Sequence, residues 1–421
     1  MTDPENPNTM QRATLMRASE QAKQRIVFVH NSADQYGASR SLLRLASALA
    51  LRQHEVHVVV PEAGSLVDLL RPIVAGVHVV PSLAVLERNQ LRSPLGLLAH
   101  AWKAVYGTAQ CVRLMRKLQP TVVHTNLALV YSGALAARLL GIPHVWHVRE
   151  NLELDAGSRA LLWLIPRLSA RIIAISSFVG SQFPERCRAK VTRVFNGLPD
   201  AEFESVAEVD QRRLAEAHGL RDDRFVITCV GRLKLKRKGQ ETLIEAMARL
   251  RHAHGPGKFI CLMVGEAAPG NERHSIALRQ LVTELQLDDE VLFVGQVADA
   301  RPYYAVSDVV VMPSAVAEPF GNVVVEAMAL GKPAVATALG GPIDQIRPGV
   351  DGLLFAPGDA HDLAAALERL YADPSLSERL GAEARRTAWA RFRISATADA
   401  VEAAYGAVVT QTRQTAQERV G

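Results

Sequence analysis

Acidic pairs of the form Asp-x-Asp are absent from the 421 residues, and cysteine is scarce, with four residues and no Cys-x-x-Cys pair. Divalent metal sites are commonly built from clustered carboxylates or from cysteine and histidine ligands. Both absences therefore disfavour a metal-assisted reaction, and no metal is expected. Isolated thiols are typical of buried, reduced cysteines in a cytosolic protein.

Long apolar runs are also missing. No run reaches the ~18 residues that would predict a membrane-spanning helix. The first 24 residues are polar and lack the apolar core of a signal peptide, so we expect a disordered lead over residues 1–24 and a cytoplasmic protein. Aromatic residues make up only 5% of the chain and do not alternate with basic residues, which argues against nucleic-acid binding.

Charge is present but unevenly distributed. Residues 1–199 contain 23 Lys and Arg against 12 Asp and Glu, a balance of +11. Residues 200–421 contain the remaining 25 against 31, a balance of −6. A basic half joined to an acidic half indicates that the first half meets an anionic partner, such as a membrane surface or a phosphorylated substrate.

Short apolar runs alternate with helix-like segments along most of the chain. The expected strands are RIVFVH, EVHVVV, VHVVP, TVVHTN, HVWHVRE and RIIAIS in the first half, and FVITCVG, KFICLMVG, VLFVGQV, DVVVMPS and KPAVAT in the second. Such strands are typical of parallel sheets that helices cover on both faces. The sequence predicts an α/β protein with two doubly wound, Rossmann-like domains, whose ligands bind in a cleft at the carboxyl ends of the strands.

A polar segment around Pro199 separates the two sets of strands and marks the domain boundary. We expect an N-terminal domain over residues 25–199 and a C-terminal domain over residues 200–393. The last helix, residues ~394–421, is expected to complete the N-terminal domain.

Two segments of the second half carry residues suited to a nucleotide-sugar. The first, VGRLKLKRKGQETL, places Arg232 directly after a strand and Lys238 before a helix, and such cations can hold a diphosphate. The second, EPFGNVVVE, has Glu318 in a loop and Glu326 inside the following helix, which we expect Asn322 to cap. Carboxylates accept hydrogen bonds from pairs of sugar hydroxyls, and two of them suit a ligand that contains two sugars.

Two segments of the first half are weaker signals. In NSADQYGASRSL, Gly37 lies between a strand and a helix, with Ser39 placed to cap that helix. In HVWHVRE, His147 lies near the end of a strand, where it can donate to a substrate oxygen or simply pack inside the domain.

These segments together resemble the retaining glycosyltransferases of family 4, which have the GT-B fold. EPFGNVVVEAMALGKPAVAT resembles the family's signature of two glutamates separated by seven residues (EX7E). The amino-terminal loop, the histidine strand, the phosphate segment and GGPIDQIRPGVDGLLFAPGD are similar to further motifs of that family. The resemblance covers nearly the whole chain and implies two Rossmann-like domains facing across a cleft.

The resemblance also implies residue roles. Arg232 and Lys238 would bind the donor diphosphate, with Lys236 as a rival for the lysine role. Glu326 would accept the ribose hydroxyls, and Glu318 would hold the donor sugar. The backbone N–H groups of Phe320 and Gly321 would also bind the sugar, and Gln296 and Val297 would contact the base. His147 would approach the transferred sugar, and Gly37 would lie on the acceptor side. At two positions the chain departs from the usual family pattern, with Ser39 and Asp344 where glutamate is common.

The implied activity is metal-independent transfer of a hexose from a nucleotide-diphosphate sugar, such as a UDP- or GDP-sugar, with retention of configuration and no cofactor. The acceptor would be a glycan or a lipid-linked glycan in bacterial exopolysaccharide, capsule or lipopolysaccharide assembly. Two alternatives stay open: a nucleotide-sugar 2-epimerase on the same fold, and a non-catalytic partner in glycan assembly.

One basic segment is not explained by these motifs. Residues 91–120 mix leucines, Trp102 and Tyr106 with arginines and lysines. An amphipathic basic helix with interfacial aromatics suits peripheral binding to the anionic inner face of the cytoplasmic membrane. An ordinary packed helix with a solvated cationic face explains the same pattern.

Overall fold

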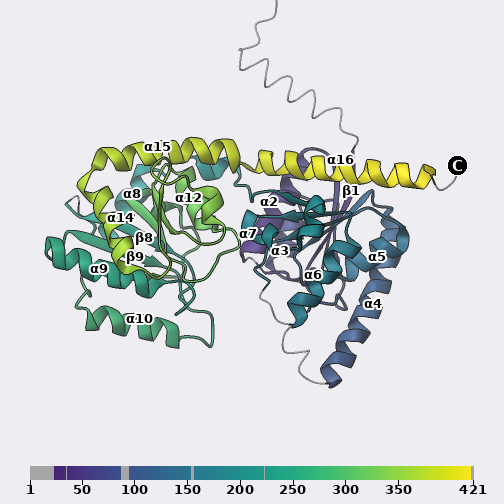
Figure 1. The fold of residues 1–421 in the computed structure, drawn as a ribbon, viewed down its shortest axis with the longest axis horizontal. Coiled ribbons are helices and arrows are strands. Elements are labelled where there is room, and N and C mark those ends of the chain that lie inside the picture. Colours follow the sequence, from purple (N-terminus) through teal and green to yellow (C-terminus); the bar gives the residue numbers. More distant parts are fainter. Residues whose placement is uncertain (1–22, 35, 87–93, 153–155, 222, 419–421) are drawn as a thin grey trace, which may run out of the picture. The chain divides into compact units, whose positions relative to one another are not determined.

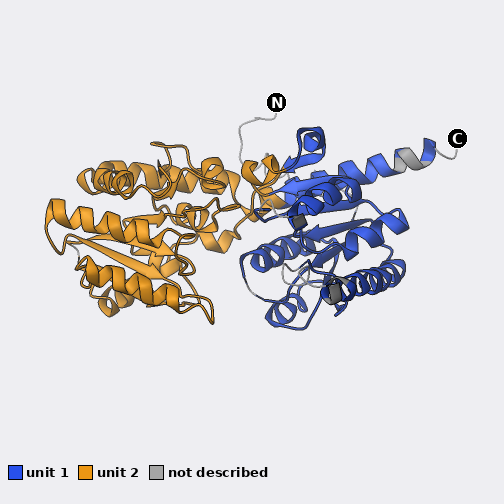
Figure 2. Cartoon of the chain, turned by 60° about the horizontal axis from the view of Figure 1, so that its bottom comes forward, with its two compact units in different colours: residues 1–174, 183–192, 398–421 blue, residues 175–182, 193–397 orange. Residues whose placement is uncertain are grey.

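The computed structural model describes residues 23–34, 36–86, 94–152, 156–221 and 223–418. The chain divides into two compact units, coloured separately in Figure 2. Unit 1 comprises residues 1–174, 183–192 and 398–421, and unit 2 comprises residues 175–182 and 193–397. Most of the predicted lead, residues 1–22, lies outside the described residues.

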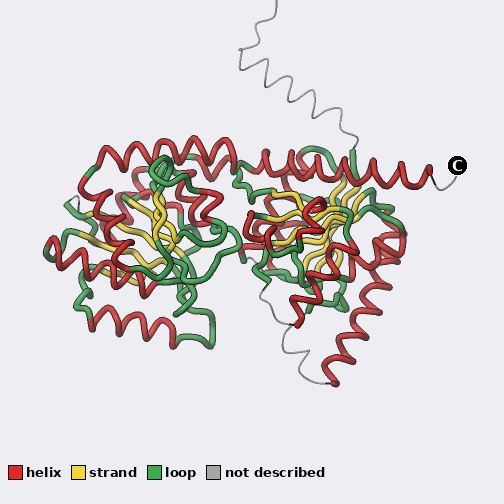
Figure 3. Tube along the Cα trace, in the orientation of Figure 1, coloured by secondary structure: helices red, strands yellow, loops and turns green. Residues whose placement is uncertain are grey.

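Unit 1 is built on a seven-stranded sheet with the strand order β3-β2-β1-β4-β5-β6-β7, in which β1 to β6 pair in parallel. Figure 3 shows the strands in yellow and the helices in red, in the orientation of Figure 1. The central strands are buried along almost their whole length, which explains why they read as apolar runs. The strands are β1 (Arg25–His30), β2 (Glu55–Val60), β3 (Gly76–Val79), β4 (Val122–Asn126), β5 (His144–Val148), β6 (Arg171–Ala174) and β7 (Val191–Arg193).

The helices of unit 1 cover both faces of this sheet. The chain moves outward from β1 to β3 and then returns past β1 to β4. Because crossovers between parallel strands are right-handed, the helices before and after this return lie on opposite faces. One face carries α2 (Gly37–Leu51) and α3 (Ser65–Leu70), and the other carries α4 (Pro94–Leu118), α5 (Ser132–Leu140) and α6 (Ala156–Leu168).

Unit 2 repeats the plan with a parallel six-stranded sheet of order β10-β9-β8-β11-β12-β13. Its strands are β8 (Phe225–Val230), β9 (Phe259–Val264), β10 (Val291–Gly295), β11 (Val309–Met312), β12 (Ala334–Thr337) and β13 (Leu353–Phe355). Its longer helices are α8 (Glu208–Ala217), α9 (Gln240–His254), α10 (Arg273–Glu284), α12 (Asn322–Ala329), α14 (Ala360–Ala372) and α15 (Pro374–Arg391). The predicted class, α/β with two doubly wound Rossmann-like domains, is confirmed.

Short helices and one long helix complete the structure. Helix α16 (Ile394–Glu418) follows α15 and belongs to unit 1 from Ala398 onward. The short helices are α7 (Ser177–Ser181), α11 (Arg301–Ala305), α13 (Pro342–Gln345) and the 3-10 turns η2 (Glu185–Lys190) and η3 (Asp200–Phe203). Of the helices in the described residues, none combines the length and the apolar character that crossing a membrane requires.

Candidate active site

The basic loop after β8 is held against the exit of β11. Gly239 has a φ of +71°, and a Cβ atom added there would lie 1.8 Å from the carbonyl oxygen of Pro313. Only glycine permits this approach without strain. The Ala315 N–H also donates to the Arg237 carbonyl at 3.0 Å. The loop that carries the predicted phosphate-binding cations therefore lies beside the loop that carries Glu318.

This arrangement brings Lys238 to Glu318. The Lys238 Nζ donates to the Glu318 Oε1 at 2.7 Å, and the Ser314 hydroxyl donates to the same oxygen at 3.2 Å. Lys236, the sequence-based rival, is exposed, and its backbone N–H donates to the Glu241 carboxylate. Of these two lysines, Lys238 contacts the predicted sugar-binding carboxylate. Arg232 lies in the same loop and is exposed.

The EX7E segment folds as a loop followed by a helix. Gly321 precedes α12 with a φ of +92°, in the left-handed region that favours glycine. The prediction that Asn322 caps this helix is wrong, because Asn322 is its first residue and Gly321 occupies the cap position without a side-chain bond. Within the described part of the chain, the backbone N–H groups of Phe320 and Gly321 have no hydrogen-bond acceptor. They lie at the positive end of α12, where an anion is favoured.

The Gly-Gly segment supports this loop from behind. The Gly341 N–H donates to the Glu318 carbonyl at 2.8 Å. A Cβ atom added to Gly340 would lie 2.5 Å from the Glu318 carbonyl oxygen, and one added to Gly341 would lie 2.2 Å from that of Phe320. Glycine is required at both positions because a side chain there would collide with the backbone of Glu318 or Phe320. The sequence analysis identifies this Gly-Gly segment only by its similarity to a family motif.

Glu326 has a partner that the sequence analysis missed. The hydroxyl of Tyr304, on α11, donates to the Glu326 Oε2 at 2.9 Å. Tyr304 is buried, and burial together with the charge of Glu326 raises its pKa well above the usual 10, so it stays a donor. This bond orients the Glu326 carboxylate in α12.

The segment of residues 175–182 is tied to the same loop. The Ser176 hydroxyl donates to the Pro319 carbonyl at 2.6 Å and accepts the Val179 N–H, which caps α7. Asp344 accepts the Ser177 N–H at 2.5 Å and an Arg193 donor at 3.1 Å. The aspartate that departs from the family pattern thus anchors α7 within unit 2. No local sequence signal indicated either bond.

The predicted base-binding residues lie just beyond β10, which ends at Gly295. Gln296 is exposed, whereas Val297 is half-buried against an apolar cluster that contains Val226 and Ile260. An exposed amide next to an apolar side chain can bind the edge and the face of a base.

In unit 1, Gly37 is the exposed first residue of α2. The prediction that Ser39 caps α2 is wrong, because the cap position is Tyr36 and no side chain bonds there. The Ser39 hydroxyl donates instead to the Asp34 Oδ1 at 2.7 Å. Its oxygen lies 3.0 Å from the His30 Nε2, which must therefore be the donor of that pair. Ser39 thus holds the loop before α2 through its hydrogen bonds to Asp34 and His30.

A buried network surrounds His147 on β5. The His147 Nδ1 lies 3.2 Å from the His124 Nε2 and 3.3 Å from the Arg149 Nη2. The His124 Nδ1 lies 2.6 Å from the hydroxyl of Tyr405 on α16. Burial lowers the pKa of both histidines well below the usual 6.5, so both rings are neutral at pH 7.

Arg149 fixes the proton positions of this network. A guanidinium only donates, so the His147 Nδ1 must accept, and the proton of the neutral ring lies on Nε2. The same Nδ1 accepts the His124 Nε2–H, and the His124 Nδ1 accepts the Tyr405 hydroxyl. Among the described residues, the buried His147 Nε2–H has no acceptor. The network therefore leaves one oriented donor at the carboxyl end of β5.

The described residues contain no group of three or more His, Cys, Asp or Glu side chains arranged to hold a metal ion. The candidate site of unit 2 thus consists of a lysine–glutamate pair, a tyrosine-oriented glutamate and unpaired backbone donors. Unit 1 separately carries the buried histidine donor. Cations beside carboxylates at strand ends are suited to a phosphate group joined to sugars.

Two family models match the chain. Residues 36–202 match the family described as Glycosyltransferase Family 4, and residues 210–387 match Glycosyl transferases group 1. The lipopolysaccharide core biosynthesis glycosyltransferase LpsD of Rhizobium meliloti is 37% identical over 289 residues, which cover 68% of this chain and 76% of LpsD. LpsE of the same organism is 40% identical over 178 residues, 42% of this chain, and the match spans about half of LpsE (48%).

Solved structures share the fold. The crystal structure of Anabaena Alr3699/HepE in complex with UDP is 25% identical, covers 91% of this chain and all (100%) of HepE, and has a TM-score of 0.77. A second HepE structure, in complex with UDP-glucose, has a TM-score of 0.72 with the same identity (25%) and covers 94% of this chain and 100% of HepE. The two Rossmann-like domains define a GT-B fold. The chain belongs to the family 4 glycosyltransferases.

Proposed function

We propose that the chain is a retaining glycosyltransferase that moves a hexose from a nucleotide-diphosphate sugar to a glycan or lipid-linked acceptor in bacterial cell-surface polysaccharide assembly. The observation that supports this proposal is the contact between Lys238 and Glu318, which joins the loop predicted to bind the diphosphate to the loop predicted to bind the sugar. The similarity to LpsD and LpsE, two lipopolysaccharide core biosynthesis glycosyltransferases, supports a role in polysaccharide assembly. The similarity to HepE, whose structures contain UDP or UDP-glucose, supports a nucleotide-sugar as the donor.

The proposed donor contacts use residues of unit 2. Lys238 and Arg232 bind the diphosphate, and the Phe320 and Gly321 N–H groups add donors at the start of α12. Glu318 accepts hydroxyls of the transferred sugar. Glu326, held by Tyr304, accepts the two ribose hydroxyls. Gln296 and Val297 receive the base.

The reaction proceeds on one face of the sugar. The acceptor hydroxyl oxygen forms a bond to the anomeric carbon while the bond from that carbon to the departing phosphate oxygen breaks. The acceptor proton passes to that phosphate oxygen, so the products are the glycoside and the protonated nucleoside diphosphate. We assign Glu318 to orienting the sugar and not to nucleophilic attack, and its Oε1 is held by Lys238 and Ser314. His147 donates from Nε2 to a hydroxyl of the transferred sugar, and Gly37 borders the acceptor.

A donor screen tests the proposal. The full chain is incubated with UDP- and GDP-sugars, with and without a bacterial membrane extract, and nucleotide release is measured. Acceptor-dependent release of the nucleoside diphosphate supports transfer, and retention is read from the anomeric configuration of the product. An altered sugar-nucleotide formed without acceptor would identify an epimerase, and donor binding without turnover would identify a non-catalytic partner.

Metal independence is a separate prediction. Lys238, Arg232 and the positive end of α12 neutralise the departing diphosphate without a divalent cation. Transfer is therefore expected to keep its rate after treatment with EDTA, and to change less than about twofold when magnesium or manganese is added. Complete loss of transfer in EDTA that either metal restores would contradict this prediction.

The His147 network yields a prediction for Tyr405→Phe. Removing this hydroxyl leaves the His124 Nδ1 without its donor and allows that ring to reverse its tautomer, which misaligns the His147 donor. We expect kcat to fall about tenfold with an unchanged donor KM, less than the ~10²–10⁴-fold contributed by a positioned proton donor, because the donor is misaligned and not removed. Tyr131→Phe is the matched control, because its hydroxyl bonds His100 outside the network at the same 2.6 Å. Equal effects of both variants on kcat would refute a positioning role for Tyr405.

A further inference from the structure

The peptide group between Pro319 and Phe320 carries one of the two unpaired backbone donors of the candidate site in unit 2. Its C=O belongs to Pro319, and its N–H belongs to Phe320. The group is trans, and a trans peptide group is planar, so its C=O and its N–H point in opposite directions. Any contact that fixes the direction of the Pro319 carbonyl therefore also fixes the direction of the Phe320 N–H.

The backbone around this peptide group does not hold the Pro319 carbonyl. The preceding carbonyl, that of Glu318, accepts the Gly341 N–H at 2.8 Å, but within the part of the chain that the structure describes no backbone N–H donates to Pro319. Its donor is the hydroxyl of Ser176, at 2.6 Å. The direction of the Phe320 N–H thus depends on one side chain that lies 143 positions earlier in the sequence than Pro319.

The Ser176 hydroxyl is itself fixed by two bonds. A carbonyl oxygen only accepts, so the hydroxyl proton lies on the bond to Pro319, and the hydroxyl oxygen accepts the Val179 N–H at 3.1 Å. Ser176 is 0% exposed, so water does not compete for either bond. One hydroxyl therefore caps α7 and holds the loop before α12 at the same time.

Helix α7 is anchored so that this hydroxyl stays in place. Asp344 accepts the Ser177 N–H at 2.5 Å, and the Arg193 Nη1 donates to the Asp344 Oδ1 at 3.1 Å. The same Arg193 nitrogen donates to the Ser177 hydroxyl at 2.7 Å. The Asp344 side chain is only 12% exposed, which protects these bonds from water.

The path of the chain brings Ser176 to this loop. Residues 175–182 belong to unit 2, whereas residues 1–174 and 183–192 on either side of them belong to unit 1. Both α7 and α12 are labelled in Figure 1. The chain thus leaves unit 1 for eight residues, places one hydroxyl on the loop that carries Glu318, and then returns.

Given the function proposed above, on which this role rests, we propose that Ser176 is a positioning residue that aims the Phe320 N–H at the donor diphosphate. Negative charge develops on the diphosphate as its bond to the sugar breaks. An N–H that is already aimed at that charge stabilises it, whereas an N–H that must first turn stabilises it less. Ser176 acts only through the peptide group of Pro319 and Phe320.

Calorimetry on the full chain with UDP and with GDP tests this role without turnover. Ser176→Ala frees the Pro319 carbonyl and should weaken nucleoside diphosphate binding about tenfold, as for one impaired hydrogen bond to a charged group. Ser176→Thr keeps the hydroxyl and should restore most of the affinity. Ser169→Ala is the matched control, because this buried hydroxyl donates to the Ile165 carbonyl at the same 2.6 Å in unit 1, and it should leave the affinity unchanged.

Transfer kinetics separate positioning from a loss of structure. We expect kcat of Ser176→Ala to fall about tenfold, less than the ~10²–10³-fold cost of removing an oriented donor, because the N–H is misaimed and not removed. The donor KM should change less than kcat, since the diphosphate carries less charge before its bond to the sugar breaks. Ser169→Ala should lower thermal stability by a similar amount and leave both constants unchanged.

An NMR measurement reports the Phe320 N–H directly. The chain contains 11 phenylalanines, so labelling with ¹⁵N-phenylalanine gives few amide signals, and the signal that is lost in Phe320→Leu identifies Phe320. In Ser176→Ala this signal should shift without ligand, and its further shift on adding UDP should become smaller. A purely structural role of Ser176 would lower the thermal midpoint but leave the Phe320 signal and its response to UDP unchanged, which would overturn the proposal.

The wild-type chain shows whether the proposed function or only the role of Ser176 fails. A wild-type chain that binds neither UDP nor GDP overturns the proposed function and this role with it. If the wild type binds one of them and Ser176→Ala binds it equally well, only the role of Ser176 is overturned. An equal loss of affinity in Ser169→Ala would also overturn it, because a general loss of stability would then explain both variants.

Discussion

Glu318→Ala is expected to lower kcat for sugar transfer by about two to three orders of magnitude, comparable to removing one oriented group that stabilises a transition state. The carboxylate holds the Lys238 ammonium in place through the 2.7 Å contact, and in the proposed function it accepts hydroxyls of the transferred sugar. Without it, Lys238 and the sugar both lose their fixed orientation. The measurement is initial-rate transfer with the donor identified by the screen, together with thermal unfolding.

The fold should survive this substitution. The Glu318 side chain is 18% exposed and that of Lys238 is 31% exposed, so water can solvate the lysine left behind. We expect a loss of about 1 kcal/mol in stability, as for a partly exposed ion pair. Glu383→Ala is the matched control, because this glutamate is 26% exposed and pairs with two arginines elsewhere in unit 2. Activity near the wild-type level in Glu318→Ala would show that the assigned site is wrong.

The strands were the most predictable part of the fold. Every run that the sequence analysis expected to form a strand does so, because strands covered on both faces must be apolar throughout. The strands β7 and β13 escaped prediction because each has only three residues. Helix α12 is a harder case, since its three consecutive valines favour a strand. Gly331, with a φ of +72°, ends the helix in time for β12, and tertiary packing overrides the propensity.

The candidate site was predictable where it depends on topology. Lys238 and Glu318 are 80 positions apart, yet both follow strands, β8 and β11, that pair in parallel. The sequence predicted that both residues follow strands of one parallel sheet, and the sheet order shows that the carboxyl ends of these two strands meet at one edge. The two helix caps were predicted wrongly because local propensity does not reveal competing partners, such as Asp34 for Ser39.

The hydrogen-bond partners of Glu326 and His124 could not be predicted from the sequence. Tyr304 reaches Glu326 from another helix, and Tyr405 reaches His124 across 281 positions. Neither tyrosine belongs to a motif, and both look like ordinary core aromatics in the sequence. Only the structure shows that the Tyr304 hydroxyl bonds Glu326 and that the Tyr405 hydroxyl bonds His124.

Lowering the pH is expected to unfold unit 1 through its buried histidines. Burial lowers the pKa of His30 to about 4 and that of His144 to about 3, and lowers those of His124 and His147 well below 6.5. Above pH 6.5 these groups are neutral in both the folded and the unfolded chain, so stability does not depend on them. Below pH 6.5 the unfolded chain binds protons that the folded chain rejects, and stability falls as the pH falls.

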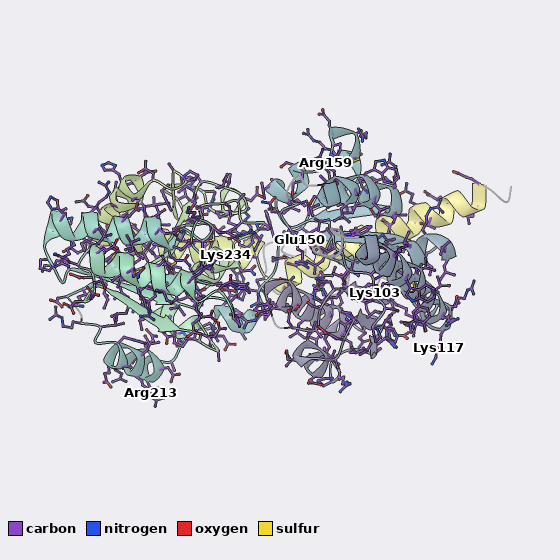
Figure 4. The ribbon with its side chains drawn as sticks, turned by 90° about the horizontal axis from the view of Figure 1, so that it is seen from below. Lys103, Lys117, Glu150, Arg159, Arg213 and Lys234 are labelled. Carbon is purple, nitrogen blue, oxygen red and sulfur yellow. The ribbon has the colours of Figure 1, made fainter. Side chains whose placement is uncertain are left out.

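One carboxyl group in the same region opposes this effect. Burial raises the pKa of Glu150, which is labelled in Figure 4, to about 7. The folded chain therefore binds a proton at Glu150 between pH 7 and the ordinary value near 4.5, so this group adds stability as the pH falls. Four histidines against one glutamate leave a net uptake of about three protons on unfolding near pH 5.5, or about 4 kcal/mol per pH unit.

That slope is large against the 5–15 kcal/mol that stabilises a typical domain, so unit 1 should be much less stable at pH 5 than at pH 7. Tryptophan fluorescence follows this transition, because Trp146 on β5 is buried whereas Trp102, Trp163 and Trp389 are 70%, 55% and 47% exposed. Thermal midpoints measured between pH 7.5 and pH 5 should drop steeply below pH 6.5. His144→Asn should reduce the slope by about one proton, whereas His252→Asn, at an exposed position on α9, should leave it unchanged. A midpoint that stays constant down to pH 5.5 would contradict the assignment of neutral, buried rings, and with it the proton positions that make His147 a donor.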